Sequence, residues 1–175
     1  LSLHDALPIF ESWAECVNVN EKYLTAIKKQ YSLQLPQVKI KRIATDKTVK
    51  FLLELSDGNL IESVLMHNKY GMSLCITSQV GCNMGCSFCA SGLLGKKRDL
   101  MVGEFISQIM VANQYIKKNI ASAKVVTNVV IMGIGEPFDN YENFKKAVTI
   151  LKEENGLAIA SRKITVSTSG LSPQI

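Results

Sequence analysis

The chain has 175 residues, of which 47% are hydrophobic and 20% are charged, as is usual for a folded globular protein. Its formal net charge of +5 is compatible with a polyanionic partner but does not by itself indicate one. The odd number of cysteines, 5, argues against a secreted disulfide framework, and no apolar run reaches the ~18 residues of a membrane span. We therefore expect a protein of the reducing cytoplasm with no membrane-spanning segment.

The amino-terminal part predicts a helix followed by a hairpin. Leu24 and Ile27 have helical spacing, which predicts a helix within residues 13–31. Residues 49–66 form two strand-like runs around Asp57-Gly58, a dipeptide typical of tight hairpin turns. The next apolar run, residues 72–78, predicts a strand that leads into a cysteine-rich loop.

Strands and helices alternate in the rest of the chain. We expect a helix over residues 102–118, a strand over 125–133, a helix over 140–156 and a strand over 162–170. The apolar stripe of the first helix consists of Phe105, Ile109, Ala112 and Ile116, and that of the second of Phe144, Ala147, Val148 and Leu151. Asp139 or Asn140 is expected to cap the second helix and Gly156 to end it. This alternation predicts an α/β fold with parallel βα units. Because three such units do not close a barrel, we expect a fragment.

Three cysteines have the spacing C-x3-C-x2-C in a loop that follows a predicted strand: Cys82, Cys86 and Cys89. Three thiolates can hold three corners of a 4Fe-4S cluster and leave one iron open to another ligand. Zinc bound by these cysteines and a distant fourth ligand, for which Cys75 is a candidate, is the main alternative, and buried free cysteines are a further one. Gly81 and Gly85 favour a tightly wrapped loop, and the spacing favours the cluster over zinc.

Longer motifs narrow the interpretation. Residues 51–66 (FLLELSDGNLIESVLM), 73–100 (SLCITSQVGCNMGCSFCASGLLGKKRDL), 129–144 (VVIMGIGEPFDNYENF) and 164–175 (ITVSTSGLSPQI) resemble the RlmN/Cfr family of radical S-adenosylmethionine (SAM) RNA adenine methyltransferases. The resemblance extends over about residues 20–175. The Gly-Glu-Pro sequence at 135–137 is closer to the adenine-C2 branch than to the C8-methylating, Cfr-type branch, which stays an alternative.

The resemblance implies a partial (βα)6-type radical SAM barrel with parallel strands, preceded by a hairpin and by the remnant of a helical domain. The expected domains are a non-native leader over residues 1–9, the remnant of a helical accessory domain over 10–35, a β-hairpin extension over 36–68 and the truncated amino-terminal half of the core over 69–175. The leader has no family counterpart and resembles a translated sequencing adapter. The family's methyl-accepting cysteine is expected beyond Ile175, so that the chain alone would be inactive.

The resemblance also implies the cofactor sites. Cys82, Cys86 and Cys89 match the ligands of the 4Fe-4S cluster. The residues that match SAM contacts are Gly135, Glu136 and Ser167. Glycine at 135 would allow a close backbone approach, and the Glu136 carboxylate could accept a charge-assisted hydrogen bond from the SAM ammonium. By chemistry alone, this segment could equally be an ordinary turn before a helix.

Two further residues match catalytic positions of the family. There, a methylated cysteine is converted to a carbon radical that adds to adenine C2, and the RNA becomes attached to the enzyme. Glu62 matches the base that removes the C2 proton, and Cys75 matches the cysteine that attacks the methylated one, forms a disulfide and releases the RNA. A packed strand cysteine and an exposed hairpin carboxylate are the ordinary interpretations of these residues.

The implied partners are 23S rRNA, tRNA and an electron donor such as flavodoxin, with a monomer favoured. Basic residues that support RNA binding are Lys28, Lys29, Lys39, Lys41, Arg42, Lys96, Lys97, Arg98, Lys117 and Lys118. Two alternatives stay open, a zinc-stabilised RNA-binding module and a radical SAM enzyme with another substrate. The module leaves the Gly-Glu-Pro segment unexplained, and the residues upstream of the cysteine loop argue against another substrate.

Overall fold

A computed structural model describes residues 20–30, 35–69, 71–120 and 125–171. The chain forms two compact units, Leu1–Leu35 and Pro36–Ile175. In the first unit, helix α1 (Glu21–Gln30) begins after Asn20, whose side-chain oxygen accepts a hydrogen bond from the Lys22 N–H at 3.0 Å. Residues 13–19 and 31 of the predicted helix lie outside the described residues.

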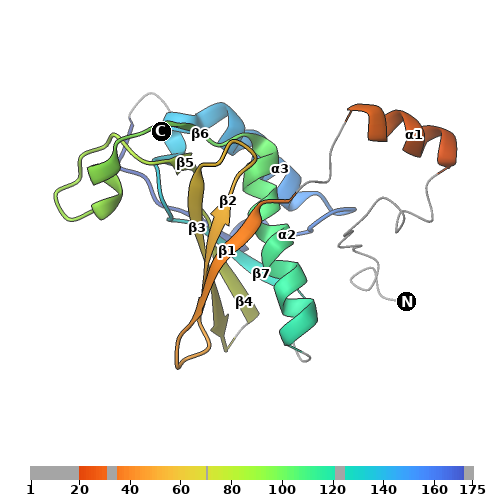
Figure 1. The fold of residues 1–175 in the computed structure, drawn as a ribbon, viewed down its shortest axis with the longest axis horizontal. Coiled ribbons are helices and arrows are strands. Elements are labelled where there is room, and N and C mark those ends of the chain that lie inside the picture. Colours follow the sequence, from red (N-terminus) through yellow and green to blue (C-terminus); the bar gives the residue numbers. More distant parts are fainter. Residues whose placement is uncertain (1–19, 31–34, 70, 121–124, 172–175) are drawn as a thin grey trace. The chain divides into compact units, whose positions relative to one another are not determined.

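The second unit is built on a mixed sheet of six strands in the order β1-β2-β3-β4-β7-β8. These strands are β1 (Gln37–Ile43), β2 (Val49–Glu54), β3 (Leu60–Asn68), β4 (Gly71–Cys75), β7 (Val126–Ile131) and β8 (Ile164–Val166). Strands β1 to β4 are antiparallel neighbours, whereas β4, β7 and β8 run parallel (Figure 1). The hairpin around Asp57-Gly58 and the parallel strands therefore form as predicted. Strand β1 was not predicted, and every one of its residues is exposed.

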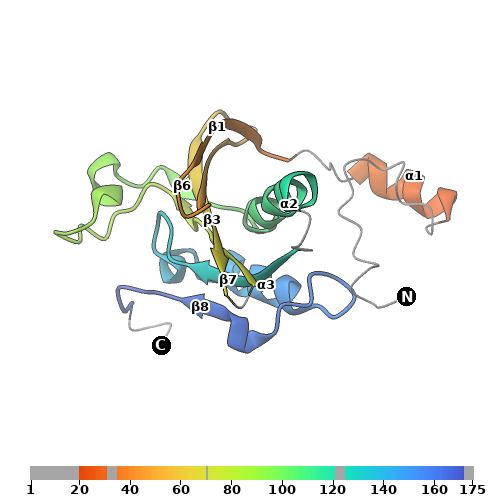
Figure 2. The ribbon, with the colours of Figure 1, turned by 90° about the horizontal axis from the view of Figure 1, so that it is seen from below.

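Helices α2 (Val102–Asn119) and α3 (Tyr141–Lys152) lie on the same side of the sheet (Figure 2). The predicted stripe of α2 is completely buried, as are Leu74 and Val129 of the sheet. Within α2, buried Asn113 accepts a hydrogen bond from the Val126 N–H at 2.7 Å and so ties the helix to the start of β7. No helix in the described part of the chain is long and apolar enough to cross a membrane.

The predicted ends of the second helix were wrong in two respects. Helix α3 ends at Lys152 rather than at Gly156, because the backbone becomes extended at Glu153 and a turn follows in which the Gly156 N–H donates to the Glu153 carbonyl. Asn140 occupies the N-cap position without capping the helix. Its amide instead donates to the carbonyls of Ser78 and Leu100, at 2.9 and 2.8 Å.

The cysteine-rich segment leaves the sheet after β4 and returns before α2. Strand β5 (Gln79–Val80) pairs with β6 (Arg98–Asp99), and between them the chain forms a loop that contains the short helix η3 (Ala90–Leu94). The loop projects away from the sheet in both views (Figures 1 and 2). At its neck Gly81 has a positive φ of 79°, and a side chain there would overlap the Gly95 carbonyl oxygen.

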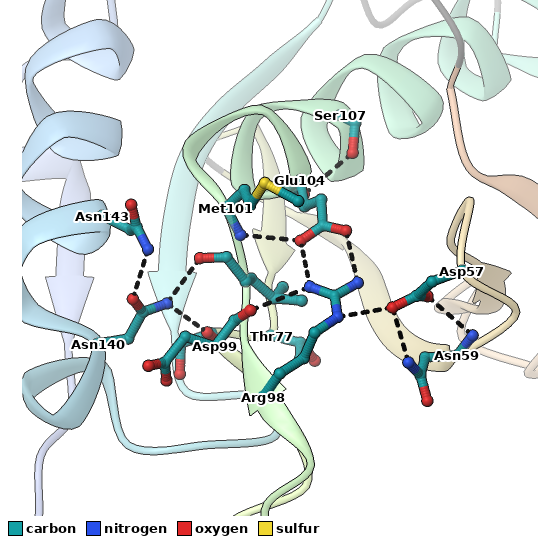
Figure 3. A network of polar contacts seen from close by, with 12 residues as sticks. Asp57, Asn59, Thr77, Arg98, Asp99, Met101, Glu104, Ser107, Asn140 and Asn143 are labelled. Atoms are coloured by element: carbon teal, nitrogen blue, oxygen red, sulfur yellow. Dashed lines mark hydrogen bonds and ion pairs between the residues drawn. The ribbon is translucent and has the colours of Figure 1, made fainter.

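Arg98 joins the returning strand to two other elements (Figure 3). Its guanidinium donates to both carboxylate oxygens of Glu104, each at 2.8 Å, in the first turn of α2, and to Asp57 at 2.6 Å in the β2–β3 turn. The hydrogen bond from Arg98, followed by those from Asn59, holds the pKa of the Asp57 carboxyl well below its ordinary range. The hairpin turn, the neck of the cysteine loop and α2 are thus held together by one side chain.

We predict that Arg98→Lys lowers the free energy of unfolding by about 1–2 kcal/mol, because lysine keeps the charge but cannot form the forked pair with Glu104 while reaching Asp57. Urea denaturation followed by circular dichroism measures this change. The control is Lys97→Arg, a neighbour whose ammonium makes a long hydrogen bond of 3.4 Å to Asn59. Equal stability of Arg98→Lys and the unaltered chain would contradict the role of the guanidinium.

Candidate active site at the carboxyl edge of the sheet

The parallel strands β4, β7 and β8 end at the same edge of the sheet, as parallel strands must. Residues 76–101 follow β4, residues 132–140 follow β7 and residues 167–171 follow β8. The sequence-predicted cluster ligands and SAM contacts are distributed over these three segments. The fold therefore brings them to one edge, where α/β proteins bind their ligands.

The cysteine loop presents its three thiols in different environments. Cys82 is buried, Cys86 is half-buried and Cys89 is exposed. The Cys89 sulfur accepts hydrogen bonds from the Ser91 hydroxyl and, more weakly, from the N–H groups of Ser91 and Gly92, which lower the pKa of its thiol.

This donor set fits an iron–sulfur cluster. Between residues 81 and 95 the loop contains no Asp, Glu or His that would compete with the thiolates, and N–H donors to a ligand sulfur suit such clusters. Among the described residues, however, no three Cys, His, Asp or Glu side chains lie together in a metal-binding arrangement. This holds also for Cys75, the candidate fourth zinc ligand.

Gly135 and Glu136 form a turn after β7 that lies against the start of the cysteine loop. Gly135 has a φ of 104°, and a Cβ on it would lie 2.7 Å from the Gln79 backbone nitrogen. In the structure the close backbone approach at this glycine is to Gln79, and an approach to SAM stays a prediction. A substitution at Gly135 would force the two segments apart.

The Glu136 carboxylate is buried, with 3% of the residue exposed, and its two oxygens accept four hydrogen bonds. One oxygen accepts from the Phe138 N–H (2.9 Å) and the Thr168 hydroxyl (2.7 Å). The other accepts from the N–H and the hydroxyl of Ser169, at 2.7 and 2.9 Å. Burial acts to raise the pKa of this carboxyl, but the donors, led by the Ser169 N–H, outweigh it and lower the pKa. The carboxylate thus connects the segments after β7 and β8.

Sequence reasoning selected Ser167 but not Thr168 or Ser169. Ser167 is exposed, and its backbone N–H donates to the Ile131 carbonyl at 3.3 Å. The hydroxyl-rich sequence Ser-Thr-Ser was a usable signal for a partner of a buried carboxylate. It could not show which of the three residues reaches Glu136.

The predicted catalytic residues Cys75 and Glu62 lie on one face of the sheet, opposite the helices. Cys75 pairs with Val64 of β3, and Glu62 lies two residues before Val64, so that the two side chains are diagonal neighbours about 7–8 Å apart. The Glu62 carboxylate forms an ion pair with Lys50 at 2.7 Å. Burial raises the pKa of the Cys75 thiol, and a hydrogen bond from the Met132 N–H partly offsets this effect.

A polar cluster that the sequence did not reveal lies between these segments and consists of Gln79, Lys96, Asp99 and Asp139. The Lys96 ammonium is 2.8 Å from the Asp99 carboxylate and 2.7 Å from that of Asp139. The amide nitrogen of Gln79 donates to the same two oxygens, at 2.7 and 2.9 Å. The Gln79 carbonyl oxygen accepts from the Glu136 N–H at 2.8 Å.

A family model described as the radical SAM superfamily matches residues 76–174. The chain belongs to the radical SAM superfamily. A protein named probable dual-specificity RNA methyltransferase RlmN from Acholeplasma laidlawii is 51% identical over 165 residues, which are 94% of this chain and 47% of that protein. Its namesake from Exiguobacterium sibiricum is 48% identical over 164 residues, or 94% of this chain and 46% of that protein.

The fold of this radical SAM chain has a close counterpart among solved structures. The crystal structure of a radical SAM methyltransferase from Sphaerobacter thermophilus matches it with a TM-score of 0.84 and 36% identity, covering 94% of this chain and 48% of the other. The predicted resemblance to RlmN and the predicted partial radical SAM barrel are thereby confirmed. The chain spans about half the length of the curated relatives it matches.

We predict that iodoacetamide modifies Cys89 at least about tenfold faster than Cys75 at neutral pH, because the exposed thiol with the lowered pKa holds the larger thiolate fraction. The metal-free chain with Cys16→Ser is suitable for this test, and peptide mass mapping follows each thiol. As the pH rises, Cys89 should reach its maximal rate at a lower pH than Cys75.

The Ser91→Ala variant should slow the modification of Cys89 and move its pH midpoint upward, since the hydroxyl donor is lost. Ser87→Ala, on the same loop, serves as the control. Faster modification of Cys75 than of Cys89 would contradict the assigned environments.

Proposed function

We propose that this chain is part of a radical SAM enzyme that methylates C2 of adenosine in 23S rRNA and tRNA, with a 4Fe-4S cluster and SAM as cofactors. The observation that carries the proposal is the meeting of the cysteine loop and the Glu136 turn at one sheet edge, close to Cys75 at the end of β4. The chain's 51% identity to a protein named as an RNA methyltransferase supports the substrate class.

Cys82, Cys86 and Cys89 are the residues that would hold the cluster, and a bound cluster supplies the electron that cleaves SAM to a carbon radical. The hydrogen bonds from Ser91 favour the thiolate form of Cys89, which is the form that ligates metal. Three thiolates would leave one iron of the cluster without a protein ligand and so able to bind the amino and carboxylate groups of SAM.

The Glu136 turn is the proposed contact for the N–H donors of the SAM amino group. A carboxylate has about four acceptor positions, and the bonds from Phe138, Thr168 and Ser169 use four. The amino group must therefore replace one of these donors. The Ser169 hydroxyl is best suited to leave, because it can rotate away while the Ser169 N–H remains bonded. The exposed Ser167 directly precedes Thr168 and Ser169 in the chain and completes the proposed site.

Glu62 and Cys75 are proposed to act in succession on an adenine carried by a methylated cysteine. Glu62 takes the C2 proton, a one-electron acceptor such as a bound cluster would take up the unpaired electron of the adduct, and the ion pair with Lys50 at 2.7 Å holds the Glu62 carboxylate in place. The Cys75 thiolate then attacks the sulfur of the methylated cysteine, so that an S–S bond forms and the S–C bond breaks. The electron pair of that bond stays with carbon, which takes up a proton as the methyl group is completed.

The RNA contacts must come from basic residues that the fold does not already use. Lys39, Lys96 and Arg98 form ion pairs with carboxylates of the chain. Arg42 and Lys117 are exposed and are the better candidates for phosphate contacts. Lys97 and Lys41 are also exposed, although Lys97 makes a long hydrogen bond to Asn59 and the Lys41 ammonium lies 5.0 Å from the centre of the Tyr115 ring. The target adenine has to be unstacked to react, which favours loop RNA as the substrate. An electron donor such as flavodoxin, a cytoplasmic location and a monomeric state belong to the same proposal.

We predict that replacing Cys82, Cys86 or Cys89 by alanine abolishes stable binding of a 4Fe-4S cluster, since each supplies one of three thiolates. Anaerobic reconstitution with iron and sulfide, followed by absorption spectroscopy and iron analysis, measures the loss. Cys16→Ala is the matched control and should keep its iron. A colourless protein with one tightly bound zinc would support the zinc-stabilised module instead.

We predict that Cys75→Ala in a full-length protein carrying this chain accumulates a covalent protein–RNA adduct. The variant keeps its cluster and still cleaves SAM, but no thiolate remains to break the link between RNA and enzyme. A denaturing gel with and without ribonuclease detects the adduct. Normal turnover, or inactivity without adduct despite an intact cluster, would count against this role. A mere packing role predicts only a modest loss of stability from the small cavity.

A further inference from the structure

The polar cluster of Gln79, Lys96, Asp99 and Asp139 has an unusual closed geometry. One oxygen of each carboxylate accepts from both the Lys96 ammonium and the Gln79 amide nitrogen, at distances between 2.7 and 2.9 Å. Burial acts to lower the pKa of Lys96, but its hydrogen bonds to Asp139 and Asp99 outweigh this and raise it. The ammonium therefore stays charged between the two carboxylates and cancels most of their mutual repulsion.

This arrangement determines the orientation of the Gln79 amide. Because the nitrogen points both of its hydrogens at carboxylates, the carbonyl oxygen must face the other way, where it accepts from the Glu136 N–H at 2.8 Å. A rotated amide would place its oxygen against two carboxylates and its NH2 group against an N–H. Gln79 is completely buried, so water cannot relieve either mismatch.

The cluster joins three segments of the chain that have to move together. Gln79 precedes the cysteine loop, Lys96 and Asp99 follow it, and Asp139 lies beyond the Glu136 turn. The Gln79 amide holds the turn directly, because its oxygen accepts a hydrogen bond from the Glu136 N–H. The Glu136 carboxylate in turn accepts hydrogen bonds from Thr168 and Ser169, so that their positions depend on that of the turn. None of the four residues of the polar cluster is a proposed ligand of the 4Fe-4S cluster or of SAM. Any effect that they have on the site is therefore an effect on the position of other residues.

We infer that the polar cluster is a positioning device: it sets the Gly135–Glu136 turn relative to the cysteine loop and thereby determines the affinity for SAM. The part that concerns SAM rests on the proposed function, whereas the positioning of the turn does not. Lys96 has the central role, because without it two carboxylates face a single neutral amide.

The test compares Lys96→Met with Lys152→Met, a matched control at the exposed end of α3. Hydrogen–deuterium exchange of the 175-residue chain reports on the amides of residues 133–136 and 168–171. We expect the amides of both segments to exchange about tenfold faster in Lys96→Met than in the unaltered chain, and to exchange at an unchanged rate in Lys152→Met. In the reconstituted protein, equilibrium dialysis should show about tenfold weaker SAM binding, with unchanged iron content.

Gln79→Glu provides a second variant, since it places a third carboxylate against Asp99 and Asp139. If Lys96→Met does not fold, Asp139→Asn takes its place, because it keeps the side-chain shape and removes one charge. Unchanged exchange at residues 133–136 in the variants that fold overturns the inference, and so does faster exchange with unchanged SAM affinity. A parent chain that binds neither iron nor SAM contradicts the proposed function, and the exchange rates then still decide whether the polar cluster positions the turn.

Discussion

The buried amide of Gln79 is the interaction on which the carboxyl edge of the sheet depends. An unpaired amide in a site without water costs about 1–3 kcal/mol per group, so arrangements that leave either end of the Gln79 amide without a partner are disfavoured. Those partners are Asp99 and Asp139 on one side and the Glu136 N–H on the other. The hydrogen bonds of this one side chain therefore hold both the end of the cysteine loop and the turn after β7 in place.

Residues with familiar local roles are used here for long-range contacts. Asn140 stands where a helix cap is expected, but its amide bridges the Ser78 and Leu100 carbonyls, and Asn143 donates to its oxygen. The Glu136 carboxylate accepts a hydrogen bond from the Phe138 N–H of its own turn, and it also accepts hydrogen bonds from the Thr168 hydroxyl and the Ser169 N–H. The segments at this edge are thus connected by side chains as well as by backbone hydrogen bonds, such as those from the Ser78 and Gln79 N–H groups to the Ile134 carbonyl at 2.9 and 3.2 Å. Such a connection lets a change at one segment reach the others without any movement of the strands.

The two faces of the sheet differ in burial, and the more accessible face carries the residues that are proposed to act on RNA. Alternating strand residues such as Phe51, Ile61 and Leu74 are buried on the side of the helices. The side chains between them, among them Glu62 and Cys75, point to the other face and remain partly accessible. The basic residues are divided in a similar way, because Arg98 and Lys96 are taken up by the fold. The net charge of +5 consequently overstates what this chain can offer to a polyanion.

The sequence by itself determined the features that depend on local pattern. The stripe of α2, the hairpin at Asp57-Gly58 and the cysteine loop each follow from spacing within one segment, and the family resemblance follows from four such motifs in order. Tertiary structure alone decided that β1 pairs at the edge, that α3 ends at Lys152 and that Thr168 and Ser169 bind Glu136. The physical reason is sequence separation: Gln79 and Asp139 meet across 60 positions. A hydrogen bond between such distant residues leaves no periodic trace in either segment, and it exists only once the parallel strands have brought their ends to one edge.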